Sequence, residues 1–485
     1  MRARWILPFL LLSTQQPTFT SIQPDLFKDG GALTNAWADF DADGDLDLFV
    51  GFSGTPNRLY QNEGKAAGHT FRNVAESFGV ADARATRASA WGDYDADGDL
   101  DLFVGFAPGD SSVFKLYRND RSRFTDVAET VGIASDSGAV RQPSWIDYDS
   151  DGDLDLFVAM RDRPNLMYRN DANRFTNVAA AIGLADTRKS VGAVWFDYDQ
   201  DGDLDVYVAN QDGHANGLFR NDRGRFTDVA EAAGAAWGGR PAGSATNGTV
   251  RPCVADVNND GLFDLFMANY GPNGLLLNRG NGRFEDVSKE WGVSIDGRHD
   301  TCDFADFDND GRIDLYVNGT VTGGVSYRDY LFRNTGARFE DVTPANLQSM
   351  NASHGARWAD FDGDLNQDLA IAGTRPDATH SLFRNQRPAA TDGSAFLVIL
   401  RTPRRIVDAG AEIRIYDTQT GRLLGTRLFD TGSGYNSQSV MPVHFGLGNR
   451  RQIQVEITEM SPQGRRVERG ASVESRVGMA TITRR

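Results

Sequence analysis

The chain has 485 residues, of which 40% are hydrophobic and 24% charged, and its formal net charge is −17. This composition excludes disordered, collagen-like and multi-span membrane proteins. The negative charge argues against a general nucleic-acid binder, because no basic excess is present to displace phosphate counterions. Two cysteines cannot support a disulfide-rich scaffold. The length favours two domains or one large repeat architecture.

The chain opens with a basic and then apolar segment. Arg2 and Arg4 precede the run from Trp5 to Leu12, which is typical of a secretory signal and too short to span a bilayer. We predict a signal peptide over residues 1–18 and a secreted or extracytoplasmic protein. No Ala-x-Ala cleavage site is present, so an uncleaved apolar N-terminus is the alternative.

Seven nine-residue windows follow, with acidic or amide side chains at alternate positions. They contain 31 of the 67 acidic residues of the chain. Carboxylates this crowded repel one another by about 1 kcal/mol or more per pair, and bound divalent cations remove that repulsion. We call these windows acidic loops one to seven; they begin at Asp39, Asp93, Asp147, Asp197, Asp256, Asp306 and Asp360.

Each acidic loop offers the oxygen ligands that Ca²⁺ prefers. Positions 1, 3, 5 and 9 carry Asp or Asn, position 7 offers its backbone carbonyl, and Gly at position 6 permits a positive φ. The predicted ligands are Asp39, Asp41, Asp43, Asp45 and Asp47; Asp93, Asp95, Asp97, Asp99 and Asp101; Asp147, Asp149, Asp151, Asp153 and Asp155; Asp197, Asp199, Asp201, Asp203 and Asp205; Asp256, Asn258, Asp260, Leu262 and Asp264; Asp306, Asp308, Asp310, Arg312 and Asp314; and Asp360, Asp362, Asp364 and Asp368.

The seven loops are not equivalent. Asn258 removes one charge from loop five. In loop seven Leu365 stands where the other loops have Gly, a penalty of about 1–2 kcal/mol if φ is positive there. We therefore predict up to seven Ca²⁺ ions, with loop seven (residues 360–368) the weakest site.

The loops recur at intervals of 50 to 59 residues, and each interval repeats the same segments. In loop one an aromatic residue, Trp37, precedes the loop by two positions, and the alternating run from Leu46 to Val50 follows it. Leu59 to Asn62 and then a Phe-x-x-Val segment from Phe71 complete the interval. Four short strands in about 50 residues are typical of a propeller blade.

One Phe-x-x-Val segment is missing after loop seven, where Asn385 is followed by Gln386, Arg387 and Pro388. A matching segment, Phe19 to Ile22, stands ahead of loop one. We therefore predict an all-β protein with a seven-bladed β-propeller over residues 19–388, closed by its N-terminal strand so that no open edge remains.

The repeated loops and strands resemble the FG-GAP (VCBS) calcium repeats of integrin α-subunit propellers. The EF-hand also has Asp-x-Asp-x-Asp-Gly, but it needs Glu at position 12 and a following helix. Position 12 of loop one is Val50, inside an alternating run. Turn-capping Asp explains one such loop but not seven, and seven near-copies offer no pair of carboxylates in contrasted environments for catalysis.

After Pro388 the composition changes, because residues 386–485 contain 15 Arg, no Lys and 9 acidic residues. Alternating runs separated by Gly-rich turns predict a smaller, sandwich-like β domain over residues 389–485. Gly432 to Gln438, followed by His444 to Gly448, resembles the ASPIC/UnbV domain found behind FG-GAP repeats in cartilage acidic proteins. The Ser-Asn-Arg stretch of that family is replaced here by residues 402–405, and the resemblance implies no chemical activity.

Two short strings in this second domain allow an alternative function, that of an aspartic protease. Leu428 to Ser433 is similar to an aspartic-protease motif, and residues 406–411 are a looser copy. Each copy of that motif normally belongs to its own lobe, whereas these lie close together in sequence. His444 has no second His or Cys nearby in sequence and is expected to be a hydrogen-bonded turn residue.

The connections between blades should lie opposite the acidic loops, and they carry basic residues. Such residues form either an ordinary solvated surface or an anion-attracting ligand face. The residues of this possible ligand face are Arg87, Arg141, Lys189, Arg251, His299, His354 and Arg357.

Cys253 and Cys302 precede loops five and six on neighbouring first strands, which favours a disulfide in an exported protein. We expect a secreted calcium-binding scaffold for an extracellular protein or carbohydrate, with no nucleic acid and no membrane span. No metalloprotease, nucleophile-elbow or phosphate-loop motif is present. The alternative is a polysaccharide-processing or cofactor-dependent enzyme with its site at the propeller mouth opposite the calcium loops.

Overall fold

The computed structural model describes residues 16–109, 112–133, 137–243, 248–348, 350, 352–373, 379–389, 394–401, 409–448, 450, 452–474 and 478–483. Most of the predicted signal segment, residues 1–15, lies outside the described residues. So do residues 402–408, which hold part of the looser protease-like string. Within the described ranges, no helix is long and apolar enough to cross a membrane.

The repeated segments fold into four-stranded antiparallel sheets, numbered here in the order of their acidic loops. The strands are β2 (Ala32–Ala38), β3 (Asp47–Phe52), β4 (Arg58–Asn62) and β5 (Phe71–Asn73) in sheet one; β6 (Thr86–Gly92), β7 (Asp101–Phe106), β8 (Phe114–Asn119) and β9 (Phe124–Asp126) in sheet two; β10 (Val140–Ile146), β11 (Asp155–Met160), β12 (Leu166–Asn170) and β13 (Phe175–Asn177) in sheet three; and β14 (Ser190–Phe196), β15 (Asp205–Asn210), β16 (Gly217–Asn221) and β17 (Phe226–Asp228) in sheet four.

Sheets five to seven follow the same order with small additions. They comprise β18 (Gly248–Ala255), β19 (Asp264–Pro272), β20 (Gly274–Asn278) and β21 (Phe284–Asp286), with β22 (Asp296–Arg298) paired to β19; β23 (Cys302–Ala305), β24 (Asp314–Val317), β27 (Tyr330–Asn334) and β28 (Phe339–Asp341), with the hairpin β25 (Val321–Thr322) and β26 (Val325–Ser326); and β29 (Ser353–Ala359), β30 (Asp368–Gly373) and β31 (Ser381–Asn385), joined by β1 (Phe19–Ser21).

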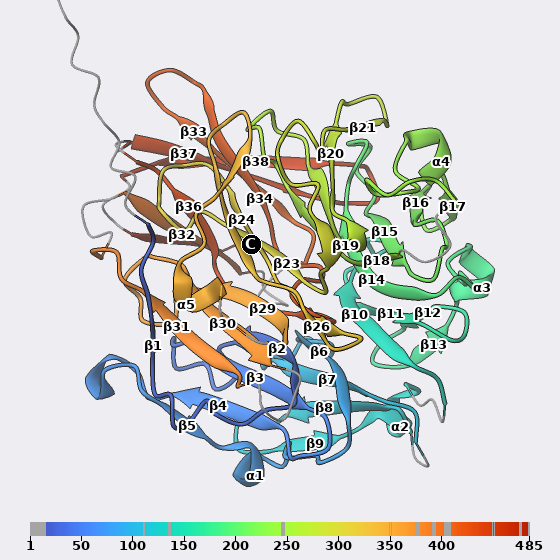
Figure 1. The fold of residues 1–485 in the computed structure, drawn as a ribbon. Coiled ribbons are helices and arrows are strands. Elements are labelled where there is room, and N and C mark those ends of the chain that lie inside the picture. Colours follow the sequence, from blue (N-terminus) through green and yellow to red (C-terminus); the bar gives the residue numbers. More distant parts are fainter. Residues whose placement is uncertain are drawn as a thin grey trace, which may run out of the picture.

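The result is an all-β protein of repeated four-stranded sheets, an arrangement consistent with a propeller. Figure 1 shows the first strands of the sheets toward the inside and the fourth strands at the outside. The first member of each sheet therefore lies nearest the middle, and each acidic loop connects a first strand to a second strand.

The N-terminal strand β1 pairs with the last strand of the repeats. It runs antiparallel to β31, with Phe19 opposite Asn385 and Ser21 opposite Phe383. The backbone N–H of Gln386 also donates to the carbonyl of Thr18 at 2.9 Å. The outer edge of β31 is thus hydrogen-bonded to a segment from the other end of the chain.

Short helices follow several fourth strands, and the sequence pattern did not predict them. Gly79, at φ 83°, ends the first of them in a left-handed conformation that glycine adopts at little cost. The helices are α1 (Ala75–Phe78), α2 (Ala128–Val131), α3 (Ala179–Ile182), α4 (Ala230–Ala233) and α5 (Ala345–Gln348), with a 3₁₀ turn at Lys65–Ala67.

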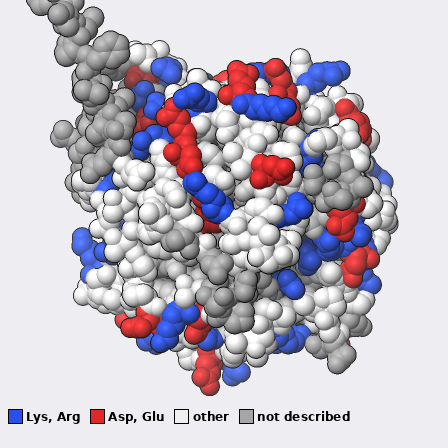
Figure 2. Space-filling model, viewed as in Figure 1, with Lys and Arg blue, Asp and Glu red and all other residues white. Residues whose placement is uncertain are grey.

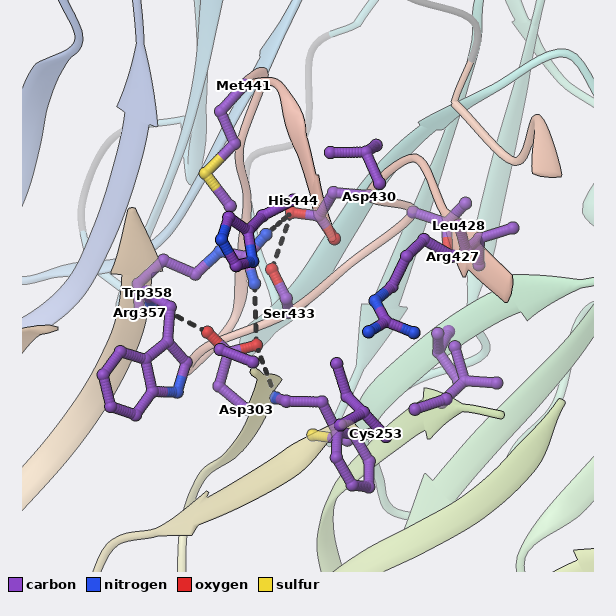
Figure 3. Close-up of a pocket in the computed structure, with 18 of the residues that line it drawn as sticks. Cys253, Asp303, Arg357, Trp358, Arg427, Leu428, Asp430, Ser433, Met441 and His444 are labelled. Carbon is purple, nitrogen blue, oxygen red and sulfur yellow. Dashed lines mark hydrogen bonds and ion pairs between the residues drawn. The ribbon is translucent and has the colours of Figure 1, made fainter. Parts of the chain in front are cut away.

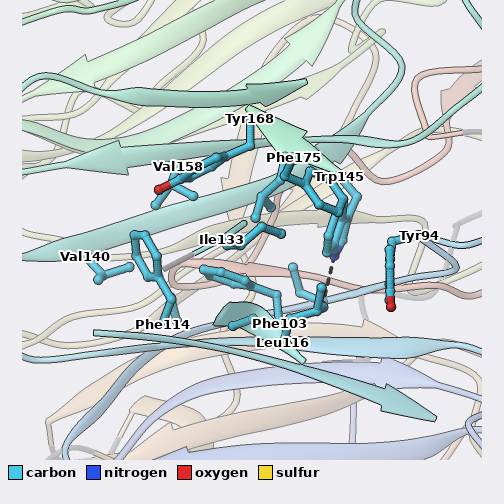
Figure 4. Packing of buried hydrophobic residues seen from close by; sticks show 14 of the residues in the cluster. Tyr94, Phe103, Phe114, Leu116, Ile133, Val140, Trp145, Val158, Tyr168 and Phe175 are labelled. Atoms are coloured by element: carbon cyan, nitrogen blue, oxygen red, sulfur yellow. Dashed lines mark hydrogen bonds between the residues drawn. The ribbon is translucent and has the colours of Figure 1, made fainter. Parts of the chain in front are cut away.

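Large aromatic side chains fill the space between neighbouring sheets. Trp145 of β10 is 1% exposed and packs with Tyr94 and Phe175, whose ring centroids lie 6.2 and 6.0 Å from its own. Figure 4 shows these rings between sheets two and three, with the indole N–H donating to Ala90 O at 3.4 Å. The Trp that precedes an acidic loop is therefore a core residue that couples adjacent sheets.

The C-terminal residues form two more sheets around a core of their own. Phe396, Ile413, Phe445 and Val455 belong to this core. One sheet has the order β36, β32, β39 and the other β34, β33, β37, β38, with β32 (Ala395–Arg401), β33 (Glu412–Asp417), β34 (Leu423–Leu428), β36 (Val443–Gly446), β37 (Gln452–Glu459), β38 (Arg466–Glu474) and β39 (Met479–Thr483).

Residues 430–440, which we call the inserted segment, leave these sheets and lie against the first strands of the repeats. Its strand β35 (Ser437–Gln438) pairs in parallel with β6. The Thr431 hydroxyl accepts from Trp195 N at 3.0 Å and donates to Trp195 O at 2.7 Å. Gln438 binds both backbone groups of Trp145 at 2.7 and 3.0 Å. The inner edges of the first strands therefore find hydrogen-bond partners in the C-terminal domain.

Candidate metal centres

Every acidic loop is wound around the carboxylate of its first residue. In loop one, Asp39 Oδ1 accepts from Asp43 N at 3.0 Å and Asp39 Oδ2 from Gly44 N at 3.1 Å. The same pair of bonds recurs in each loop, down to Asp360, which accepts from Asp364 N and Leu365 N at 3.1 and 2.9 Å. The backbone bonds fix the loop shape, and they leave the remaining lone pairs of this carboxylate for a ligand.

The Asp at position 9 opens the second strand and is held from two sides. Asp47 Oδ1 accepts from Asn62 N at 2.8 Å and Asp47 Oδ2 from Phe40 N at 3.2 Å. Because these donors come from the third strand and from the loop itself, the sheet positions the carboxylate against the loop.

The Asn that ends each third strand connects neighbouring sheets. Asn119 Nδ2 donates to Leu100 O of its own loop at 3.1 Å and to Phe40 O of loop one at 2.8 Å. Sequence analysis recorded this Asn as part of a repeated segment but assigned it no role. The equivalent bonds to the preceding loop are made by Asn170 to Tyr94 O, Asn221 to Tyr148 O, Asn278 to Tyr198 O, Asn334 to Val257 O, Asn385 to Phe307 O and Asn62 to Phe361 O.

The predicted ligands converge in the loops. Groups of three carboxylates bring one oxygen each within 4.8 Å of one another: Asp39, Asp41 and Asp43; Asp93, Asp95 and Asp101; Asp147, Asp149 and Asp155; Asp197, Asp199 and Asp205; and Asp306, Asp308 and Asp314. Four of these groups contain a buried oxygen that has no hydrogen-bond partner among the described residues, at Asp95 Oδ1, Asp149 Oδ1, Asp199 Oδ1 and Asp308 Oδ1. Such orphaned oxygens, all at position 3, fit the donor set of a Ca²⁺ site.

Burial disfavours uncompensated negative charge on these carboxylates. Desolvation raises the pKa of Asp93 to about 7 and that of Asp155 to about 9, against an ordinary value of 3.8. Neighbouring aspartates add to the shift in both loops, for example Asp95 beside Asp93. A bound cation would supply the missing counter-charge and favour the ionised forms.

Protein cations already contact some of the loops. Arg333 Nε lies 2.7 Å from Asp308 Oδ2 in loop six, and Arg384 Nε lies 2.7 Å from Asp362 Oδ2 in loop seven. From the C-terminal domain, Arg465 Nη1 lies 2.7 Å from Asp197 Oδ2 in loop four. These arginines compensate part of the negative charge, and sequence analysis did not single out any of them as partners of the loops.

Loop seven adopts the same backbone conformation as the other loops, although its leucine at position 6 makes that conformation costly. Leu365 adopts φ 67° at position 6, where Gly44 has φ 98° in loop one. Position 4 also has a positive φ in every loop, with Ala42 at 60° in loop one and Gly363 at 69° in loop seven. Loop seven therefore places its glycine at position 4 and a leucine at position 6.

The basic residues of the possible ligand face do not form one exposed ring. Five of them belong to first strands and not to connections: Arg87 to β6, Arg141 to β10, Arg251 to β18, and His354 and Arg357 to β29. Arg251 and Arg357 are in addition only 1% and 6% exposed. His299 is 1% exposed, and Lys189 is exposed and paired with Asp212 at 2.8 Å. Arg251 and Arg357 contradict the expected layout because inward-facing positions on first strands are covered by the inserted segment. On the face seen in Figure 2, basic and acidic side chains are interleaved.

Arg87, Arg141 and His354 remain together, around Tyr435 of the inserted segment. The rings of His354 and Tyr435 have centroids 3.8 Å apart, and His354 Nδ1 lies 2.8 Å from Asp300 Oδ2. Burial raises the pKa of Tyr435, while the positive charges of Arg141 and Arg87 oppose that rise. Two arginines thus lie close enough to this phenol to act on its charge.

Other residues singled out in the sequence also have defined places. Cys253 and Cys302 form a disulfide that links β18 to β23, with Cα atoms 6.1 Å apart. Asp430, from the protease-like string, is paired with Arg357 at 2.8 Å. His444 Nε2 lies 3.1 Å from Leu365 O.

Comparison with known proteins agrees with the repeat. The FG-GAP-like repeat model matches residues 39–104, 93–158, 147–208, 197–267 and 256–317, each match running from one acidic loop through the next. The chain belongs to the FG-GAP-like repeat family. Because the matches overlap, these FG-GAP-like repeats form one continuous array over more than half of the chain.

The whole chain is also similar to named relatives. Cartilage acidic protein 1 of Mus musculus is 27% identical over 97% of this chain and 78% of its own length. The Homo sapiens protein of that name is 26% identical over 96% of this chain and 77% of its own length. Among solved structures, BBS1N in complex with ARL6DN aligns with 77% of this chain and 99% of that chain at a TM-score of 0.48 and 10% identity.

Proposed function

We propose that the seven sheets are the blades of a closed propeller. The pairing of β1 with β31 supplies the fourth strand of the seventh blade. Asn62 Nδ2 donates to Phe361 O at 2.9 Å, which joins the first sheet to the last. The same contact joins each of the remaining pairs of neighbouring sheets. A ring in which the first and last units are joined like all the others leaves no unpaired edge.

We propose that this propeller is a calcium-stabilised, secreted scaffold that binds an extracellular protein or carbohydrate. The observation that carries the calcium assignment is the buried, unpartnered oxygen at position 3 of loops two, three, four and six. Asp and Asn side chains, together with the position 7 carbonyl, would hold the ion. Bound Ca²⁺ would supply positive charge to the carboxylates. Similarity to cartilage acidic protein 1 over nearly the whole chain supports placement outside the cell.

Calorimetric titration with Ca²⁺ and thermal unfolding in excess EDTA test the metal assignment. Calcium that binds only the folded chain should raise the melting temperature, and its removal should lower it. Asp95→Ala should lower the stoichiometry by one, whereas Asp120→Ala, in an exposed turn after β8, should not. A chelated protein with an unchanged melting curve and no detectable metal would contradict the proposal.

We propose that the ligand surface includes Arg87, Arg141 and His354 around Tyr435. The two arginines suit an anionic sugar or an acidic protein segment because they supply positive charge, while the buried Tyr435 packs beneath them. Binding should weaken at least tenfold in the Arg87→Glu, Arg141→Glu double variant and persist in Arg338→Glu, at a side chain that is 63% exposed. Unaltered binding by the double variant would exclude this surface.

We propose binding and not catalysis as the role of this surface. In the described residues, Asp430 is committed to Arg357 and lies in the inserted segment, which disfavours a carboxylate dyad there. A glycan array probed with and without chelator separates the two roles. Retained, chemically unchanged ligand supports a scaffold, and cleaved or modified ligand supports the polysaccharide-processing or cofactor-dependent enzyme.

A further inference from the structure

A cavity of about 140 Å³ lies between the C-terminal domain and the first strands of sheets five to seven. Asp303 and Trp358 line it from the repeats, and Arg427, Asp430 and His444 line it from the C-terminal domain (Figure 3). Tyr435 is not among its lining residues, and the only lining residue with a proposed calcium role is Asp306 of loop six.

Two of the three carboxylates that line this cavity, Asp303 and Asp430, are already paired with an arginine, and the third is Asp306 of loop six. Arg357 Nη1 lies 2.8 Å from Asp303 Oδ1, and Arg357 Nη2 lies 2.8 Å from Asp430 Oδ2. The second oxygen of Asp303 accepts from Trp358 N at 3.0 Å, and Asp430 Oδ2 also accepts from Ser433 Oγ at 2.6 Å. One arginine therefore bridges both aspartates.

Arg427 faces the cavity without such a partner. It is 8% exposed, and among the described residues it forms no ion pair. Its Nη1 donates to Thr426 O at 3.0 Å, while its Nε has no hydrogen-bond acceptor. Figure 3 shows the guanidinium pointing into the open part of the cavity. A buried cation with an unused donor is costly unless an acceptor-rich group joins it.

The charged residues around the cavity also favour an added negative group. Arg251 lies beside the Asp303 and Asp430 pair, is 1% exposed, and leaves Nε and Nη2 without acceptors. Arg251, Arg357 and Arg427 thus carry three positive charges near Asp303 and Asp430, and the third carboxylate that lines the cavity is Asp306 of loop six. The other carboxylates whose field reaches Arg427 are Asp256, Asp306 and Asp314, and these belong to acidic loops five and six, where they are proposed calcium ligands.

We propose that this cavity binds a small anion, a halide or the carboxylate of a small organic acid, with Arg427 as its cationic contact. The volume accommodates such an anion together with water, since a single water needs about 10–15 Å³ on the same measure. His444 Nε2 bonds the Leu365 carbonyl, so its Nδ1 is left as an acceptor, and water in the cavity would donate to it.

Crystallography of the full chain with bromide tests the site directly. Crystals equilibrated in bromide as the sole halide should give an anomalous peak in the cavity, within contact distance of Arg427 Nε. Parallel crystals in acetate should show a planar carboxylate there if organic acids are the better ligands. Ordered water alone in both crystals would overturn the proposal.

A solution measurement compares Arg427→Gln with Arg338→Gln at constant ionic strength and saturating calcium. The wild type and Arg338→Gln should show a saturable rise in melting temperature with bromide or acetate, roughly 1–3 °C at a hundredfold excess over the dissociation constant. Arg427→Gln should lose this rise. A saturable response that survives in Arg427→Gln would place the anion elsewhere, and if that variant does not fold, the crystallographic result on the wild type decides.

Discussion

At the scale of single residues, the Asn at the end of each third strand joins one acidic loop to its neighbour. Asn170 is completely buried and donates to Tyr94 O at 3.0 Å and to Leu154 O at 3.1 Å. Both carbonyls belong to buried residues, Tyr94 at 4% and Leu154 at 5% exposed, and they would lose this donor without the amide. The residue therefore contributes to the shape of two acidic loops at once.

Asn170→Ala should lower the free energy of unfolding by about 2–4 kcal/mol, because two buried carbonyl oxygens lose their donor. Urea unfolding monitored by tryptophan fluorescence measures the change. Gln419→Ala, which removes an exposed amide, is the control and should be near neutral. A loss below about 0.5 kcal/mol would show that water or a shifted backbone replaces the amide.

Buried His380 should make the protein sensitive to acid. Its ring nitrogens lie 2.9 Å from Tyr60 Oη and 2.9 Å from Asp29 O, and burial lowers its pKa to about 4 from 6.5. Because the unfolded chain takes up this proton first, stability is fully present above pH 6.5 and is lost as pH falls toward 4. The loss from this residue is of order 3 kcal/mol.

The comparison of wild type and His380→Gln between pH 7 and pH 4.5, in excess calcium, isolates this effect. The variant should lose less stability over that interval than the wild type does, whatever its stability at pH 7. Parallel pH dependence in the two proteins would mean that another group accounts for acid sensitivity.

At the scale of elements, the acidic loop depends on two backbone positions with positive φ. Position 6 is glycine in six loops and Leu365 in loop seven, while position 4 is a non-glycine residue such as Ala42 in six loops and Gly363 in loop seven. A leucine in the left-handed region costs about 1–2 kcal/mol. Loop seven carries this cost at position 6, where the other loops have their largest positive φ.

Leu365→Gly should raise the unfolding free energy by about 1 kcal/mol, and Gly44→Ala should lower it by about 1–2 kcal/mol. Gly44 is a clean test, because nothing lies within 4 Å of an added Cβ and only the backbone conformation is affected. Thermal unfolding in saturating calcium measures both. Unchanged stability in Leu365→Gly would contradict the prediction, because it would mean that loop seven relaxes to a conformation in which the leucine carries no cost.

The fold was largely predictable from the repeat, because loops, alternating strands and the Phe19 segment are local patterns that recur. The four-residue helices were missed, since each is a single turn, and a glycine such as Gly79 ends it in α1 to α4. The prediction placed Arg251 and Arg357 on exposed connections, because the sequence alone does not distinguish a strand position that faces inward from one that faces solvent. The contacts of residues 430–440 depend on pairing between distant parts of the chain, which no local pattern records.

At the scale of the whole molecule, the N-terminal strand and the inserted segment bring the two ends of the chain to the repeats. β1 covers the edge of β31, and residues 430–440 occupy the inner edges of the first strands. The repeats therefore depend on sequence that lies outside the seven acidic loops on both sides.

Deletion of residues 1–30 should lower the melting temperature sharply, because it removes β1 and exposes the edge of β31. A chain beginning at Pro17 keeps Thr18 and β1 and is the matched control, which should melt close to the full chain. Scanning calorimetry with calcium present measures both. Identical melting of the two shortened chains would rule out a structural role for the N-terminal strand.

The pairing of Phe19 with Asn385 also sets an order of events during synthesis. The segment that leaves the ribosome among the first has no partner until nearly four-fifths of the chain has been made. Until then, an early strand and the edge it will cover are both available to other polypeptides. Folding helpers that shield exposed strands would therefore matter most for nascent chains of this protein that have not yet reached Asn385.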